Sequence, residues 1–254
     1  MPTPAEHHEH DAEAKRELLD TLEEFGYAIL HVPASSYNPG FAYTVGLKHT
    51  FDHPEIILIG LDPENTEEIL SGVVEAVASG LGMIAGKPLN GFLEGHPVIF
   101  EEVPHARALS CMGYAHWFYK GKPWDTLQFI WPDMQGAFAW EEGYEEDFRY
   151  QQPLLSRNPD FWYNEPKDLA VVTLRQYLEE EKPILEVHHD EEGDWQFLTG
   201  DELKEEDLRW VSLHTMVQRD ATLNDIFDLE YGECALRQSR EHPWVRYTKN
   251  AEGE

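Results

Sequence analysis

Apolar and polar positions along the chain follow helical spacing in some segments and strand spacing in others. After Ala12, apolar residues at helical spacing predict an amphipathic helix that ends at Gly26 (Leu18, Leu22 and Phe25). The run from Glu55 to Leu61 is almost continuous in Ile and Leu, which is typical of a strand buried on both faces. Asp62 and Pro63 then favour a helix start, with Asp62 as N-cap and Pro63 at the first helical position.

Other segments carry weaker versions of the same patterns. Strands are predicted at residues 27–32, 41–47, 96–103, 126–131, 183–189, 195–200 and, as the last strand, 233–238. Residues 169–182 fit either a strand or a helix, and short helices at 212–218 and 222–227 begin at hydroxyl residues that favour N-caps. The expected fold class is α+β, in two modules that each hold a mostly antiparallel sheet with flanking helices.

A connector is predicted in the middle of the chain. Residues 141–166 combine acidic residues, several prolines and a few apolar and aromatic anchors. The expected division is a flexible N-terminus, an N-terminal α+β domain, a linker and a smaller C-terminal α+β domain (residues 1–11, 12–157, 158–168 and 169–254).

Acidic residues outnumber basic ones in both halves of the chain. The 254 residues include 49 Asp and Glu against 19 Lys and Arg, a formal net charge of -30. Residues 1–157 hold 25 acidic and 9 basic residues, and residues 158–254 hold 24 and 10. Such a field repels nucleic-acid phosphates and anionic membranes, so neither is an expected partner. A basic protein partner is favoured instead, with solubility alone as the simpler explanation of the charge.

The sequence lacks the common motifs of nucleotide binding and nucleophilic catalysis. GxxxxGK[ST], GxGxxG and GxSxG do not occur, and Cys111 and Cys234 have no CxxC spacing. These features favour a binding protein over an enzyme. The sequence also has no apolar run of membrane-spanning length and no apolar signal segment, which predicts a cytoplasmic protein.

The segment between the second and third predicted strands is rich in histidine. His49, His53 and Glu55 would fit a metal-dependent or acid–base site. However, HxxxH spacing brings two imidazoles together only on a helix, and Pro54 opposes a helix at this point. The preferred interpretation is that His53 bonds to backbone and shapes a turn, and no metal site is predicted.

Aromatic residues concentrate at residues 114–119 and around the strand that follows. They define a candidate pocket or interface (Tyr43, His53, Glu55, Tyr114, His116, Tyr119, Trp131 and Asp133). A flat aromatic wall can stack a flavin or a haem, although core packing or a protein interface is the simpler interpretation. Asp133 fits either a catalytic carboxylate or a turn-stabilising side chain. No cofactor is predicted, with flavin or haem as the alternative.

The C-terminal half contains a second candidate interface at Trp195, Asp201 and Glu202. The two neighbouring carboxylates could hold a metal ion. In so acidic a chain, solvated turn residues are the simpler interpretation of the pair.

Several segments of the N-terminal half resemble a known family. FAYTVGL, FDHPEIILIGL, GYAHWFYKGKPWDTLQFIWPD and QPLL occur in this order, and together they resemble the bacterial domain-of-unknown-function family numbered 4262 over about residues 24–155. The resemblance implies no established activity and transfers no catalytic residue.

Two segments of the C-terminal half are loosely similar to a second family. GDWQFLTGDE and WVSLHTMVQRDATLNDIFDLEYGECALR resemble the domain-of-unknown-function family numbered 2185 over about residues 184–247. That family is associated with immunity proteins of bacterial toxin systems, so the resemblance implies an immunity-like role. The ending SREHPWVR departs from the family pattern.

Taken together, the sequence predicts an acidic cytosolic binding protein, immunity-like or regulatory, that recognises a basic protein partner. Two alternatives remain. The first is an enzyme resembling the split barrels that hold flavin or haem, and the second is a metal-dependent enzyme using His49, His53 and Glu55.

Overall fold

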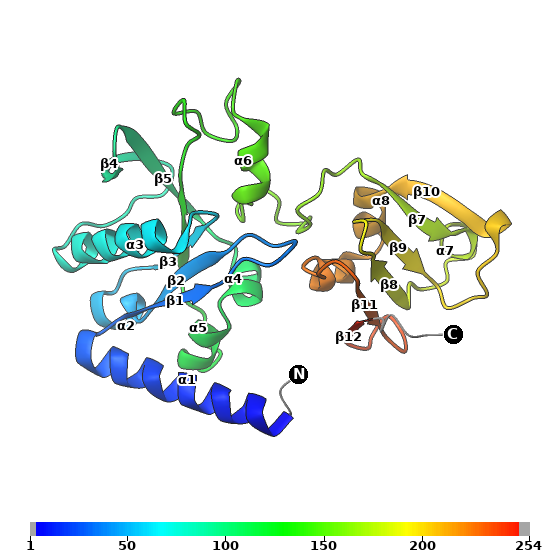
Figure 1. Cartoon of the computed structure of the whole chain (residues 1–254), viewed down its shortest axis with the longest axis horizontal. Coiled ribbons are helices and arrows are strands. Elements are labelled where there is room, and N and C mark those ends of the chain that lie inside the picture. Colours follow the sequence, from blue (N-terminus) through cyan, green and yellow to red (C-terminus); the bar gives the residue numbers. More distant parts are fainter. Residues whose placement is uncertain (1–3, 249–254) are drawn as a thin grey trace. The chain divides into compact units, whose positions relative to one another are not determined.

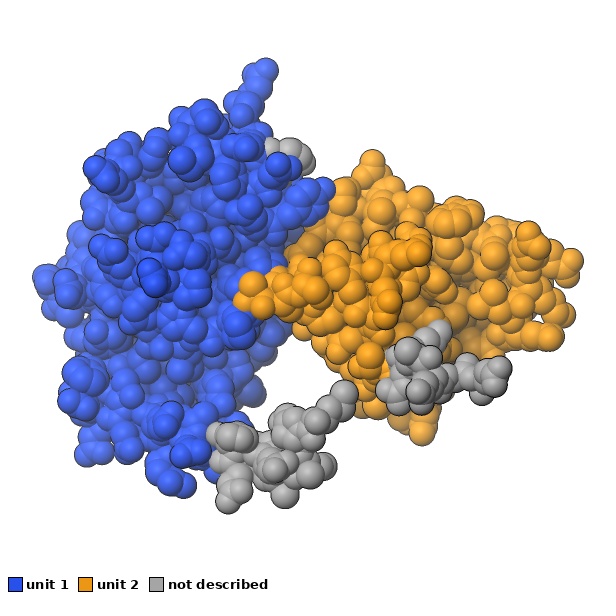
Figure 2. Space-filling view, in the orientation of Figure 1, with its two compact units in different colours: residues 1–33, 39–159 blue, residues 34–38, 160–254 orange. Residues whose placement is uncertain are grey.

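The computed structural model of the chain describes residues 4–248 and divides into two compact units (Figure 2). Unit 1 comprises residues 1–33 and 39–159, and unit 2 comprises residues 34–38 and 160–254. Each unit is built on its own six-stranded sheet with helices around it (Figure 1). The expected α+β fold class with two sheet modules is confirmed.

Unit 1 contains a mixed sheet with the strand order β1-β2-β3-β6-β5-β4. Its strands are β1 Ala28–Val32, β2 Phe41–Val45, β3 Glu55–Ile59, β4 Pro88–Leu93, β5 His96–Glu102 and β6 Thr126–Ile130. All neighbouring strands are antiparallel except β3 and β6, which run parallel and pair Glu55 with Thr126. A parallel pair needs a long crossover, and here it contains α3, β4, β5, α4 and α5.

Helices cover both faces of the unit 1 sheet (Figure 1). They are α1 Pro4–Phe25, α2 Leu47–Phe51, α3 Pro63–Ala78, α4 His105–Cys111, α5 Gly113–Phe118 and α6 Glu146–Gln151. Along β3, Ile56 and Leu58 pack in the cluster that contains α3, whereas Ile57 and Ile59 pack in the cluster that contains residues of α1, α4 and α5. Because successive strand side chains point to opposite faces, a sheet covered on both sides requires an apolar residue at every position. The predicted doubly buried strand is therefore confirmed.

The helix boundaries in unit 1 follow local chemistry. Asp62 caps α3 as predicted, because its side chain accepts a hydrogen bond from the Asn65 backbone N–H at 3.0 Å. Gly26 ends α1 in a left-handed conformation, with φ of 81°. The helix begins earlier than the sequence indicates, at Pro4, so it includes residues 4–11 of the expected flexible N-terminus, and residues 1–3 lie outside the described part.

Unit 2 contains a second mixed sheet, with the order β10-β7-β9-β8-β11-β12. Its elements are β7 Ala170–Leu174, α7 Arg175–Glu179, β8 Glu186–His189, β9 Trp195–Leu198, η1 Glu205–Asp207, β10 Leu208–Ser212, α8 Leu213–Arg219, η2 Ala221–Ile226, β11 Glu233–Leu236 and β12 Val245–Thr248. Only β7 and β9 are parallel, and one apolar cluster around Trp195, Phe197 and Met216 forms the core.

Residues 34–38 belong to unit 2 although they lie between β1 and β2 in the chain. Tyr37 packs against the unit 2 core and donates its hydroxyl to Glu165 at 2.8 Å. Glu165 also accepts the indole N–H of Trp195 at 2.7 Å. No local sequence pattern predicts that residues 34–38 belong to unit 2, because the hydrogen-bond partner of Tyr37 lies more than 120 residues away in the chain.

Several elements of unit 2 differ from the sequence-based prediction. The ambiguous segment 169–182 contains both a strand and a helix, β7 followed directly by α7. Ser212 caps α8 as expected, but Asp220 rather than Thr222 caps the next helix, which is a 3-10 helix. The strand at residues 233–236 is not the last, since β12 follows it. Within residues 4–248, no helix combines the length and apolarity needed to cross a membrane.

Candidate functional site

A pocket of about 440 Å³ lies in unit 1 at one end of the central strands, where β3 and β6 begin and β5 ends. It is lined by Pro54, Met83, Ala85, Glu102, Val103, His105, Trp124, Asp125, Thr126 and Leu127. Ligand pockets for small molecules have about this size, and this lining combines apolar residues with the polar side chains of Glu102, His105, Asp125 and Thr126. The pocket is therefore the candidate functional site.

The sheet register brings the lining residues together. Glu55 pairs with Thr126 across the parallel strands, so Pro54 and Asp125, the residues just before them, lie at the same end. Glu102 pairs with Leu127 across β5 and β6. The Val103 N–H donates to the Thr126 carbonyl at 2.9 Å and continues this pairing beyond the end of β5.

The polar side chains of the lining are two carboxylates, the rings of His105 and Trp124, and the buried Thr126 hydroxyl. Glu102 and Asp125 are both exposed, and neither has a salt-bridge partner among the described residues. No Lys or Arg belongs to the lining of this pocket in the described part of the chain. A charged ligand therefore meets negative charge at the pocket wall.

Trp124 forms the aromatic wall of the pocket. Its side chain is almost fully buried, with 4% exposure, and stacks on Tyr119 at 5.6 Å between ring centroids. His105 packs edge-on against the same indole at 4.8 Å. Within residues 4–248, neither the indole N–H of Trp124 nor Nδ1 of His105 has a hydrogen-bond partner. Buried polar atoms without partners are rare in folded proteins and are functional candidates.

Met83 reaches the pocket from the connection between α3 and β4. Its backbone N–H donates to Nε2 of His53 at 3.2 Å, and Nδ1 of His53 lies 2.7 Å from the Pro54 carbonyl. These bonds require a neutral imidazole with its proton on Nδ1. Burial lowers the pKa of His53, which favours the same neutral form.

Behind the pocket, Glu55 is completely buried at the start of β3. Its carboxylate accepts from the Thr44 hydroxyl at 2.6 Å, from the backbone N–H groups of Gly46 and Lys48 at 3.1 Å each, and from the Tyr119 hydroxyl. Burial raises the pKa of Glu55, while hydrogen bonds from Thr44, Tyr119 and the Lys48 and Leu47 backbone oppose the shift. Glu55 therefore organises the turn into α2 and is closed to solvent.

The residues proposed from sequence around Tyr43 form a packed layer next to the pocket. The Tyr43 hydroxyl accepts from the Tyr114 backbone N–H at 3.4 Å, and burial raises the pKa of Tyr43 to about 12. Tyr119 contacts both Glu55 and Trp124, and the ring of His116 lies 6.3 Å from that of Trp124. None of these residues lines the pocket itself.

Trp131 and Asp133 serve other parts of unit 1. The Trp131 indole donates to the Ile59 carbonyl at 2.9 Å inside the core. Asp133 accepts from the backbone N–H groups of Gln135 and Ala137, each at 2.9 Å. Burial by itself raises the pKa of Asp133, but its backbone donors outweigh burial and hold the pKa below the ordinary value. This arrangement fits the turn-stabilising interpretation.

The histidine-rich segment does not assemble metal ligands. His49 lies in α2, a five-residue helix missed by the sequence prediction, and this helix ends before His53. Both nitrogens of His53 bond to backbone groups, and the Glu55 carboxylate is occupied by its four donors. Within the described residues, no group of three or more His, Cys, Asp or Glu side chains could hold a metal ion.

The second candidate interface is dispersed over unit 2. Trp195 is a core residue, stacked on His189 at 4.1 Å between ring centroids. Asp201 accepts from Lys182 at 2.6 Å and from Thr199 at 2.8 Å, while Glu202 lies 3.7 Å from Lys204. The three residues therefore have separate structural surroundings.

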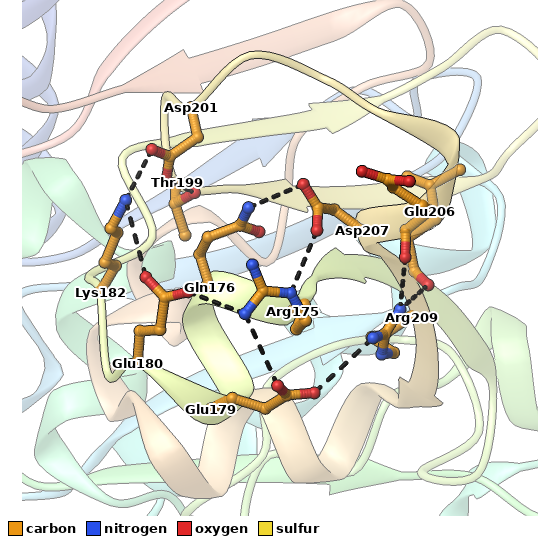
Figure 3. Close-up of polar contacts among 11 residues, drawn as sticks. Arg175, Gln176, Glu179, Glu180, Lys182, Thr199, Asp201, Glu206, Asp207 and Arg209 are labelled. Atoms are coloured by element: carbon orange, nitrogen blue, oxygen red, sulfur yellow. Dashed lines mark hydrogen bonds and ion pairs between the residues drawn. The ribbon is translucent and has the colours of Figure 1, made fainter.

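Asp201 belongs instead to a polar network around α7 (Figure 3). Arg175 bonds to Asp207 at 3.1 Å and to Glu180 at 2.8 Å, and Gln176 donates to the other oxygen of Asp207 at 2.8 Å. The hydrogen bonds from Gln176 and Arg175 lower the pKa of Asp207. The network ties η1 and β10 to α7, so its charges are paired within unit 2.

The comparison with protein families bears on unit 1. Residues 21–145 match the family model described as Domain of unknown function (DUF4262). The DUF4262 match runs from within α1 to beyond β6 and includes all ten pocket-lining residues. The first resemblance seen in the sequence is therefore confirmed over this range.

The comparisons give no support for a C-terminal module of family 2185. No curated protein matches the chain, and no solved structure matches it. The DUF4262 description assigns no activity, so function has to be argued from the site.

The sequence indicated only the neighbourhood of the pocket. His53 and Glu55 flank the lining residue Pro54, and Trp124, Asp125 and Thr126 lie within the quoted family segments. The sequence signal for the pocket was a pair of short polar segments, each of which leads directly into a buried strand. That these two strands are parallel neighbours, with their beginnings side by side, is visible only in the fold.

Proposed function

We propose that this chain is a non-catalytic binding protein whose unit 1 holds a small organic molecule in the pocket. The observation that carries the proposal is the combination of a 440 Å³ pocket, lined by apolar and polar residues, with a buried indole N–H that has no partner among the described residues. A ligand with an acceptor atom would satisfy this N–H.

The lining chemistry supports binding more than catalysis. No Ser, Cys or Lys lines this pocket in the described part of the chain, and the one side-chain hydroxyl of the lining, that of Thr126, is directed to the Met112 sulfur at 3.9 Å. Met83 is fixed by the hydrogen bond to His53, and Trp124 is fixed by Tyr119 and His105. Fixed walls of this kind lower the ordering cost of binding.

A flavin or haem is the less favoured occupant. Flavin phosphates and haem propionates are anionic, whereas the charged side chains in the lining are Glu102 and Asp125. The earlier alternative of a flavin or haem enzyme would require a cationic partner that this lining does not supply.

The proposal is tested by filling the pocket. Ala85 is half-buried in the lining, so Ala85→Phe should occupy the cavity and weaken ligand binding by about tenfold or more. Ala139, also half-buried but not part of the lining, provides the matched control Ala139→Phe. The probes are benzyl alcohol, benzylamine and benzoate, with affinity measured by calorimetry and location by the NMR shift of the Trp124 indole N–H.

Binding of at least one probe, weakened in Ala85→Phe and retained in Ala139→Phe, supports the proposal. The proposal is overturned if none of the three probes binds, or if Ala85→Phe leaves all affinities unchanged.

A second candidate function is recognition of a basic protein in the cytoplasm. It is supported by the net charge of -30 and by its even distribution over the two halves of the sequence. A partner of this kind should associate more slowly as ionic strength rises, as measured by stopped-flow mixing. The immunity-like role rests on the resemblance to family 2185 alone and remains a prediction.

A further inference from the structure

We infer that the ligand of the unit 1 pocket is a small organic cation with an aromatic or apolar body, bound where β5 ends and β6 begins. This inference rests on the proposed function and specifies its ligand class. It follows from the placement of Glu102, Asp125 and Trp124 in one lining.

The two carboxylates are placed as neighbours by the sheet. Glu102 is directly opposite Leu127, and Asp125 lies two residues before Leu127, just outside β6, where the hydrogen bond from the Val103 N–H to the Thr126 carbonyl continues the pairing. Diagonal positions of this kind are about 7–8 Å apart in an antiparallel pair, which leaves room for one ammonium group to contact both side chains.

Both carboxylates remain available to a ligand. Nearby acids are neutralised within the protein: Glu101, adjacent to Glu102, is bonded to Arg157, with Arg157 Nε 3.2 Å from its carboxylate. Among the described residues no equivalent ion pair is made by Glu102 or Asp125. Lys48 is close enough for Asp125 to contribute to its raised pKa, but its ammonium group is bonded to Asp52 at 2.8 Å.

Trp124 provides a second, independent reason for a ligand in this pocket, one that carries an acceptor atom. The indole N–H is buried and has no partner within the described part of the chain, so an acceptor on the ligand would complete it. The side chain is already held by Tyr119 and His105, so little freedom is lost on binding.

The electrostatic field of the whole chain also favours a cationic ligand. With a net charge of -30, the protein attracts cations and repels anions before they reach the pocket. Carboxylates or phosphates of the ligand would in addition face Glu102 and Asp125. An anionic small molecule is therefore the least favoured ligand class.

The experiment compares three probes that share one ring and differ in charge. The ammonium group of benzylamine has no acceptor for the Trp124 N–H, but it meets two carboxylates, so benzylamine should bind about tenfold more tightly than benzyl alcohol. Benzoate should bind most weakly. The double variant Glu102→Gln/Asp125→Asn should abolish the advantage of benzylamine over benzyl alcohol. The double variant Glu68→Gln/Glu94→Gln also removes two negative charges, but from exposed positions outside the lining. It should retain the advantage of benzylamine over benzyl alcohol.

The outcomes separate the ligand class from the proposed function. If benzyl alcohol or benzoate equals benzylamine while Ala85→Phe still weakens binding, the cation inference is wrong and the binding site stands. The cation inference is also wrong, and the binding site stands, if Glu102→Gln/Asp125→Asn still binds benzylamine more tightly than benzyl alcohol by the same factor as the unchanged protein. If no probe binds at all, the proposed function fails together with this inference.

Discussion

At the scale of single residues, two buried carboxylates have net pKa shifts of opposite sign. Burial raises the pKa of Glu55, which has only neutral donors around it. Burial also acts to raise the pKa of Asp220, but hydrogen bonds from Thr222 and from Arg237, at 2.6 Å, outweigh it, and the net shift is downward. At Asp220 the buried Arg237 cation adds to the Thr222 hydrogen bond, whereas the donors to Glu55 include no cation.

Glu55→Gln should destabilise the folded protein by about 2 kcal/mol. The amide has one acceptor oxygen where the carboxylate has two, so part of the donor set formed by Thr44, Tyr119 and the α2 turn loses its acceptor. Chemical denaturation at neutral pH measures the change. Glu68→Gln, an exposed substitution on α3, is the control and should have almost no effect. Equal stability of the two variants would contradict a role for Glu55 in fixing this turn.

At the scale of elements, the connection between α3 and β4 is held to the sheet by one titratable contact. The Met83 N–H donates to His53, and Met83 is a wall of the pocket. Protonation of His53 at Nε2 would remove this acceptor. The hydrogen bond that holds Met83 in the pocket wall therefore depends on pH.

The protection of the Met83 amide from hydrogen exchange should fall under acidic conditions. Because burial lowers the pKa of His53 below its ordinary 6.5, the stabilising contribution is fully present above that value. It is lost as pH falls through the lowered pKa of the folded state. NMR-detected exchange, with rates corrected for the intrinsic pH dependence, measures this change.

His53→Gln removes the titrating group and should abolish the pH dependence of the corrected exchange rate of the Met83 amide. His49→Gln changes an exposed neighbour in α2 and should leave it intact. A pH dependence that persists unchanged in His53→Gln would show that another group controls this connection.

At the scale of the whole molecule, charge repulsion opposes folding. A net charge of -30 is concentrated in the folded state and spread out in the unfolded chain. Some of this cost is offset by paired networks such as the one around Arg175, whose Glu180, Glu179 and Asp207 contacts connect several elements (Figure 3). Salt screens both effects.

The melting temperature should rise as sodium chloride is increased from roughly 20 to 300 mM, because the 49 acidic residues of the sequence far outnumber its 19 basic ones. Differential scanning calorimetry measures it, with sucrose of equal osmolality as the control for osmotic effects. A fall in melting temperature would mean that the ion-pair networks contribute more to stability than repulsion removes.

The sequence predicted the elements whose two faces are buried or whose ends have strong local chemistry. The β3 strand is apolar at every position after Glu55, and α3 has both its cap and its apolar stripe in the local sequence. The elements it missed lack such signals. β4, β10 and β12 lie at sheet edges and are partly exposed, and α2 is a single short helix fixed by Gly46 and Glu55.

The sequence by itself determined the fold class, the acidity and the family resemblance of the first half, because composition and local periodicity carry them. Only the tertiary structure decided the pocket. The parallel pairing of β3 with β6 joins segments about 70 residues apart, and it brings Pro54, Glu102 and Asp125 into one lining. Such pairing depends on long-range burial of both sheet faces, which no local pattern of residues can specify.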